Sequence, residues 1–451
     1  MRSALLISTY EMGRQPFGLA SAAAWLRAAG WTVAMVDAAK DTLSLERLSG
    51  LDLIAFHLPM HTATRLAGPV IAAARRVSPA ARLCAFGLYA PLNAEWLRGL
   101  GVDEIFGGEF EEELAAWANT DPTDRKEPQR PPRSRAPLPR IHFLVPDRSG
   151  LPPLTKYATL QMPDGERRVV GYTEASRGCR HLCRHCPVVP IYNGQFRIVQ
   201  ADVVLADIAA QAAAGAGHIT FGDPDFFNGP THAMRIVSAL HAAHPGVSYD
   251  ATIKVEHLLA HRELVPQLAA TGCAFVTSAI ESVDDEVLRR FDKRHTRADF
   301  VEAVALCRES GVTLVPTFVA FHPWLTLAGY RELLDTIAAL DLIDHVAPIQ
   351  LAIRLLVPRG SRLLELDEMR AHLGAFDAET LTYRWTHPDP RVDGLQRDVM
   401  TLVGTRPGAE RGQLFDEVRA MASERAGLSH PDTRPARARA TVPYLDEPWY
   451  C

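Results

Sequence analysis

The sequence has no uninterrupted apolar run approaching the roughly eighteen residues of a membrane span. Its start, MRSALLISTYEMGRQ, carries one early arginine but only a four-residue apolar run, so neither a signal peptide nor a transmembrane helix is expected. Seven cysteines among 451 residues are too few for a disulfide framework, and their odd number indicates a reducing compartment. Neither charge dominates, since 48 Lys and Arg face 53 Asp and Glu, a net charge of -5. We therefore expect a cytoplasmic protein whose partners do not include nucleic acid or membranes.

What the chain does have is enough apolar sequence for two or three domains, with 47% hydrophobic and 22% charged residues. Over residues 1–118, short apolar runs alternate with amphipathic helical patterns, which predicts a doubly wound parallel sheet. The expected strands are 4–8, 32–37, 51–58 and 82–89, and the expected helices include 18–30 and 65–77.

A change of composition separates this region from the next. Residues 119–164 include DPTDRKEPQRPPRSRAPLPR, whose prolines and arginines predict a partly extended, solvated linker. Residues 165–370 resume the alternation, which predicts a partial (β/α)6 barrel with reactive groups at the C-terminal ends of its strands. Residues 371–451 are expected to be helical, with a loosely held tail of about twenty residues. The expected barrel strands are 168–175, 218–223, 247–253, 274–281, 313–321 and 349–356.

Three cysteines lie close together directly after the first expected barrel strand. They are Cys179, Cys183 and Cys186 in the segment CRHLCRHC, and three thiolates in one loop can converge on a metal centre. A [4Fe-4S] cluster held by three cysteines leaves one iron open for a ligand. A zinc site is the alternative and needs a fourth ligand, for which His181, His185 or His218 could serve. A disulfide would leave one cysteine unpaired.

The spacing Cys-x3-Cys-x2-Cys after the first strand of a partial barrel resembles the radical S-adenosylmethionine (SAM) superfamily. The resemblance implies that Cys179, Cys183 and Cys186 hold a [4Fe-4S] cluster. It also implies that the open iron binds SAM, and that an electron from the cluster cleaves a carbon–sulfur bond to make a radical. The residue before the last cysteine, often aromatic in the family, is His185 here, which can still lie over adenine.

Further positions fit the same resemblance. Gly222, Asp223, Pro224 and Asp225 follow the second strand and resemble the loop that accepts hydrogen bonds from the SAM ammonium. Glu281 and Lys293 stand where the family commonly places an acceptor for the ribose hydroxyls and a cation for the SAM carboxylate, although a surface lysine is the alternative for Lys293. The segment 315–323 resembles the strand that contacts adenine, with Ala320 and His322 in place of glycines. Arg354 on the sixth strand points either into the cavity, toward a carboxylate, or outward.

Residues 1–118 resemble the cobalamin-binding domain that precedes the barrel in one branch of this superfamily. The pattern D-x-H-x-x-G that supplies a histidine below the cobalt is absent, and His57 and His61 are nearby candidates. A domain that binds no corrin is the alternative.

The last residues, YLDEPWYC, end at Cys451. This ending resembles a group of radical SAM proteins whose C-terminus reads Cys-selenocysteine-Ala-Glu-Pro or Cys-Cys-Ala-Glu-Pro. We therefore expect the native polypeptide to continue beyond Cys451 through a selenocysteine. That group is similar to the radical SAM enzyme of arsinothricin biosynthesis, which moves a 3-amino-3-carboxypropyl group from SAM to arsenic.

The resemblance thus implies a radical SAM enzyme, of transferase or lyase type, that acts on a small-molecule substrate. Its electron donor would be a protein such as flavodoxin or ferredoxin. Two reactions stay open, aminocarboxypropyl transfer and cobalamin-dependent radical methylation or natural-product tailoring. The alternative that is not an enzyme is a zinc-binding module.

Overall fold

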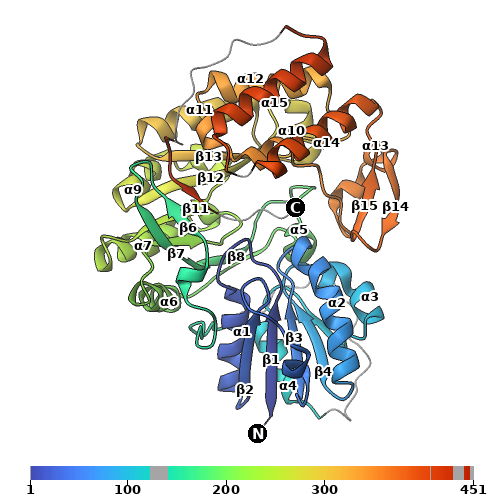
Figure 1. Cartoon of the computed structure of the whole chain (residues 1–451). Coiled ribbons are helices and arrows are strands. Elements are labelled where there is room, and N and C mark those ends of the chain that lie inside the picture. The colour runs from blue at the N-terminus through green and yellow to red at the C-terminus, as the bar shows by residue number, and fades with distance from the viewer. Residues whose placement is uncertain (1, 122–140, 407, 430–440, 447–451) are drawn as a thin grey trace.

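The computed structural model describes residues 2–121, 141–406, 408–429 and 441–446. It contains two α/β units, with the N-terminal unit at the bottom of Figure 1 and the second unit above it. No helix among these residues has the length and hydropathy that a membrane crossing requires.

The N-terminal unit is a five-stranded parallel sheet in the order β2-β1-β3-β4-β5. Its strands are continuous apolar runs because helices bury both faces of the sheet. Helices α1 and α4 cover one face, and α2 and α3 cover the other (Figure 1). The doubly wound prediction is confirmed. The elements are β1 (Ser3–Ser8), α1 (Phe17–Ala28), β2 (Thr32–Asp37), β3 (Leu53–His57), α2 (His61–Val77), β4 (Arg82–Phe86), α3 (Ala94–Gly99), β5 (Glu104–Phe106) and α4 (Glu111–Asn119).

The second unit is a curled, open sheet with five parallel strands in the order β7-β10-β11-β12-β13. Helices cover its outer face, and α11 begins with a capping box in which Thr296 and Asp299 exchange hydrogen bonds with each other's backbone. The strands and helices are β7 (Arg167–Thr173), α6 (Ala201–Ala213), β10 (His218–Phe221), α7 (Pro230–Ala243), β11 (Ser248–Thr252), α8 (Val255–Ala260), α9 (Val265–Ala270), β12 (Cys273–Glu281), α10 (Asp285–Phe291), α11 (Arg297–Glu309), β13 (Thr313–Phe318) and α12 (Leu327–Ala339).

The expected sixth strand at 349–356 does not form. Residues Pro348–Leu351 make a 3-10 turn, and a single bridge joins Phe321 to Arg354. The reason is a side chain: Gln350 Oε1 accepts a hydrogen bond from the Phe318 backbone N–H at 3.0 Å, which a sixth strand would otherwise satisfy.

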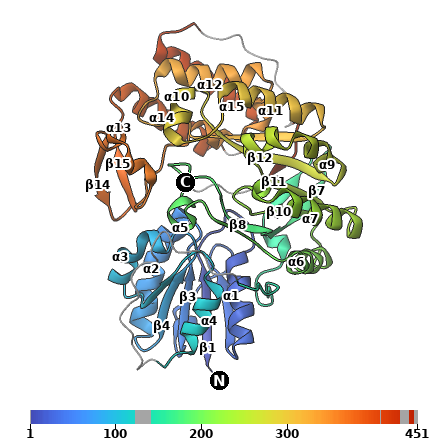
Figure 2. The same ribbon diagram turned by 180° about the vertical axis from the view of Figure 1, so that it is seen from behind.

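The C-terminal region is only partly helical. Helices α14 (Pro390–Thr405) and α15 (Arg411–Ala426) lie in the region predicted to be helical, and the short helix α13 (Asp367–Arg370) precedes it. Strands β14 (Leu373–Asp377) and β15 (Thr382–Trp385) instead form an antiparallel hairpin beside the N-terminal unit (Figure 2). The tail is also held in part, because β16 (Tyr444–Leu445) pairs with β6 (Thr159–Gln161), which in turn pairs with β7.

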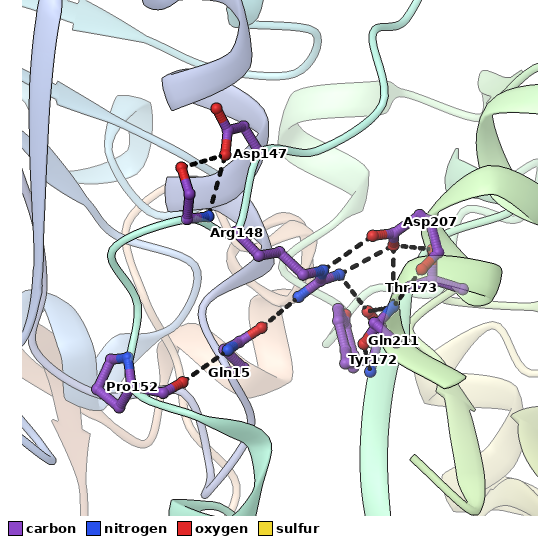
Figure 3. A network of polar contacts seen from close by, with 9 residues as sticks. Gln15, Asp147, Arg148, Pro152, Tyr172, Thr173, Asp207 and Gln211 are labelled. Carbon is purple, nitrogen blue, oxygen red and sulfur yellow. Dashed lines mark hydrogen bonds and ion pairs between the residues drawn. The ribbon is translucent and has the colours of Figure 1, made fainter. Parts of the chain in front are cut away.

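The described end of the expected linker joins the two units. Arg148 donates to Asp207 of α6 at 2.8 and 2.9 Å, to the Tyr172 carbonyl at 2.7 Å and to Gln15 of the N-terminal unit at 2.8 Å (Figure 3). Gln15 also donates to the Pro152 carbonyl. Asp207 is 1% exposed, so this is a buried, charge-assisted contact rather than a solvated linker.

A second buried contact joins the units near the cysteine segment. Arg177 lies 2.7 Å from Glu111 and 3.5 Å from Glu109, both of the N-terminal unit, and 2.7 Å from Glu174. Burial raises the pKa of Glu109 to about 7, although Arg177 opposes the shift.

Candidate functional site

The three cysteines lie in a loop that a short antiparallel ladder closes at its base. Strands β8 (Ser176–Gly178) and β9 (Phe196–Ile198) form this ladder beyond the end of β7. Gly178 has φ +75°, and a Cβ there would lie 2.3 Å from the Tyr192 ring and 2.5 Å from the Gln195 carbonyl. Only glycine fits directly before Cys179.

Contacts from distant segments fix the rest of the loop. The Arg184 N–H donates to the Phe291 carbonyl at 2.9 Å, and Arg362 donates to the Leu182 carbonyl at 3.0 Å. Leu88 of the N-terminal unit packs against the small cluster that contains Cys179. The loop is therefore shaped by both units.

The thiols of Cys179, Cys183 and Cys186 are free, and all three lie in this loop. Burial raises the pKa of Cys179, and burial together with Cys183 raises that of Cys186 to about 12. Metal binding to these two cysteines would therefore release protons.

Among the described residues, Cys179, His181 and Asp225 form a group whose possible ligand atoms all lie within 4.8 Å of one another. This group combines one of the three cysteines with an imidazole and a carboxylate, which are all possible zinc ligands.

The zinc alternative finds little support among its candidate histidines. His218 is bound to Ser248 at 2.8 Å and Asp250 at 2.9 Å, and His185 is bound to Glu281. Only His181 joins a cysteine in a compact group, and that group leaves two of the three cysteines unused.

Glu281, Lys293 and His185 come together beside the cysteines. The Glu281 carboxylate lies 3.3 Å from Lys293 Nζ and 3.0 Å from His185 Nε2. Burial opposes ionisation, but Lys293 and His185 lower the pKa of Glu281 to about 2. Glu281 also has φ +70°, a strained backbone for a non-glycine residue, and such strain clusters at functional sites. Lys293 is 3% exposed, so the surface alternative for it is wrong.

The segment Gly222 to Asp225 lies after β10, as expected, but its residues make contacts within the protein. A Cβ on Gly222 would lie 1.7 Å from the Tyr172 hydroxyl, so this glycine makes room for Tyr172. Asp223 accepts hydrogen bonds from Ser176 at 2.5 Å and from the Ala175 N–H at 2.9 Å. Burial raises the pKa of Asp223 to about 7. The backbone carbonyls, including that of Pro224, are the groups left for a ligand.

Arg354 is not brought to the cysteines. It donates to Asp393 and to the Trp385 carbonyl, both at 2.6 Å, and its guanidinium stacks 3.5 Å from the Trp385 ring. Its partners therefore belong to the C-terminal region. His322 is buried, and burial lowers its pKa to about 3. Cys451 lies outside the described residues.

Sequence reasoning missed three buried residues around the cysteines. Asn228 Oδ1 lies 3.9 Å from Cys179 Sγ, and Lys254 Nζ lies 3.9 Å from Cys183 Sγ. His257 lies 2.7 Å from Asp225 and 3.2 Å from His181. The available signal was position alone, since Lys254 and His257 follow the third strand of the barrel sheet at its C-terminal end.

Comparison with known proteins agrees with this geometry. Residues 173–337 match the sequence profile of the radical SAM superfamily. These residues therefore form a radical SAM domain, the catalytic domain of enzymes that use a [4Fe-4S] cluster and SAM.

Two curated relatives illustrate the range of the match. The chain is 28% identical over 188 residues to a tRNA-2-methylthio-N(6)-dimethylallyladenosine synthase of Desulfosudis oleivorans, covering 40% of each chain. It is 26% identical over 153 residues to the hopanoid C-3 methylase of Methylococcus capsulatus, covering 34% of this chain and 29% of that protein. The chain thus spans less than half the length of these relatives.

Solved structures extend the similarity of fold to the N-terminal unit. The match to the cobalamin-dependent SAM radical enzyme OxsB covers 94% of this chain and 71% of the OxsB chain, with a TM-score of 0.68 and 13% identity. The radical SAM methyltransferase TsrM from Kitasatospora setae covers 76% of this chain and 72% of its own, with a TM-score of 0.63 and 18% identity.

Proposed function

We propose that this chain cleaves SAM reductively and uses the resulting radical to transfer a group to, or otherwise modify, a small molecule. The observation that carries the proposal is the gathering of three free thiols in one loop beside the buried group of Glu281, Lys293 and His185. When bound, the cluster supplies the electron that cleaves a carbon–sulfur bond of SAM.

Each residue then has a role that its position supports. Cys179, Cys183 and Cys186 hold the cluster. Lys293 binds the SAM carboxylate, and Glu281 orients Lys293 and accepts from the ribose. The barrel and the N-terminal unit enclose the site and keep water from the radical.

Radical methyl transfer with cobalamin is favoured by the fold of the N-terminal unit, which the OxsB match includes because it covers 94% of this chain. At the C-terminal edge of its sheet, His61 Nε2 contacts the Thr380 carbonyl at 2.5 Å. His57 Nδ1 is paired with Glu11 at 2.6 Å, and its Nε2 packs so closely against Gly18 that a Cβ on that glycine would lie 2.2 Å away. If a corrin binds here, neither imidazole is therefore expected to coordinate its cobalt.

Aminocarboxypropyl transfer to arsenic is the finer alternative implied by the family resemblance. Methylthio transfer has less support, because the other described cysteines, Cys84, Cys273 and Cys307, are buried in three different elements and offer no second trio. The proposal also includes a cytoplasmic location and an electron donor such as flavodoxin or ferredoxin.

Product analysis tests these reactions. Anaerobically reconstituted protein, reduced with dithionite, is incubated with SAM with and without hydroxocobalamin. 5′-Deoxyadenosine indicates reductive cleavage, S-adenosylhomocysteine that depends on cobalamin indicates methyl transfer, and methylthioadenosine indicates aminocarboxypropyl transfer. Absence of all three from iron-loaded protein contradicts the proposal.

A further inference from the structure

Lys254 is a buried cation next to a cluster ligand. It lies between β11 and α8, its side chain is 7% exposed, and Nζ lies 3.9 Å from Cys183 Sγ. Its backbone N–H donates to Asp225 Oδ1 at 3.4 Å, which fixes the position of the residue. Its ammonium group therefore faces the sulfur from a well-anchored backbone.

The surrounding carboxylates compensate this charge only in part. Glu256 lies 3.7 Å from Nζ but is 31% exposed, so water screens it. Asp225 is fully buried, yet its Oδ2 is 2.7 Å from His257 Nδ1. A buried ammonium is costly without an anion close by, and the Cys183 sulfur becomes one when it binds a metal as thiolate.

Lys293 provides the contrast. Lys293 is also buried near Cys183 and Cys186, but the buried carboxylate of Glu281 lies 3.3 Å from its Nζ and compensates its charge. Of the two buried lysines, Lys254 has more charge free to act on the sulfur.

We infer that Lys254 tunes the cluster electrostatically: its ammonium, close to Cys183 Sγ, raises the reduction potential of the bound cluster. Lys254 thus acts on the cluster through its charge and does not bind it. This inference rests on the proposed function. Reduction adds one electron from a low-potential, one-electron donor and breaks no bond. It also adds one negative charge to the centre, which a nearby cation stabilises, and contacts to cluster sulfurs are known to set such potentials.

A redox titration followed by electron paramagnetic resonance tests the inference on the full-length reconstituted protein. Lys254→Met and Lys254→Gln remove the charge, Lys254→Arg keeps it, and Lys156→Met is the control because Lys156 is exposed. Iron and sulfide content and the dissociation constant for SAM are measured on each.

With iron and sulfide equal to wild type, both neutral variants should show a roughly tenfold lower ratio of reduced to oxidised cluster at a fixed potential, about 59 mV for one electron. Lys254→Arg should recover most of the shift, and Lys156→Met should show none. An unchanged potential in the loaded neutral variants overturns the inference, as does weaker SAM binding without a change of potential. If wild-type protein binds no iron, the proposed function itself fails.

Discussion

Lys293 Nζ lies 3.3 Å from Glu281 Oε1, and His185 Nε2 approaches the same oxygen at 3.0 Å. One buried carboxylate oxygen therefore holds two nitrogen groups beside the cysteine loop. The Glu281 carboxylate therefore fixes the position of the Lys293 ammonium group and compensates its charge in the absence of a ligand.

Lys293→Met should weaken SAM binding about ten- to hundredfold, from the roughly 1.5–3 kcal/mol of a hydrogen bond to a charged group. Isothermal titration calorimetry on reconstituted protein measures it. Lys293→Arg should bind with intermediate affinity, and Lys156→Met should match wild type. Equal affinity in Lys293→Met and wild type would remove Lys293 from the SAM site.

Cys183→Ala should abolish both the brown absorbance and SAM cleavage, because two remaining thiols do not hold the cluster. Absorbance spectra, iron analysis and 5′-deoxyadenosine production measure this. Cys307→Ala is the matched control, since Cys307 is a buried free thiol in α11. Continued SAM cleavage by reconstituted Cys183→Ala protein would show that the ligand assignment is wrong.

Glu109→Gln should stabilise the protein at pH 8 but not at pH 5. The pKa of Glu109 is raised from 4.5 to about 7 in the folded state, so its stabilising contribution is complete below pH 4.5 and is lost as the pH rises to about 7. The glutamine avoids this loss, on the order of 1–3 kcal/mol. Thermal unfolding at both pH values tests it, with Glu112→Gln on the exposed face of α4 as control. A stabilisation equal at both pH values would contradict the assignment.

Arg148→Met should lower the free energy of unfolding by about 3–5 kcal/mol, because it leaves the Asp207 carboxylate buried without its cation. Urea unfolding measures the change. Arg167→Met, at an exposed ion pair with Asp446, should cost less than about 1 kcal/mol. If the two variants lose similar stability, Arg148 does not clamp the units together.

Most of the fold could be predicted from the sequence because strands buried on both faces are continuous apolar runs, as in β1, β3 and β4. The segment 349–356 carries the same kind of run, but Gln350 bonds the neighbouring strand through its side chain, which no periodicity reveals. The hairpin of β14 and β15 was missed because its strands are only partly buried.

Some residues of the candidate site could likewise be predicted from the sequence, and others could not. The cysteines could be found from their spacing and Glu281 from its place at a strand end. The role of Arg354 could not, because its partners Asp393 and Trp385 lie 39 and 31 residues away along the chain. Lys254 carries no motif of its own, and only the folded chain brings it to Cys183.

Arg177 stands two positions before Cys179 and pairs with Glu111 of the other unit at 2.7 Å, besides Glu174 of its own unit at the same distance. A hybrid protein that exchanged residues 1–118 for those of a relative would therefore need an acid at the position of Glu111. Without it, the buried guanidinium next to the cysteine loop would lose one of its two close carboxylates, so the two units are constrained to change together.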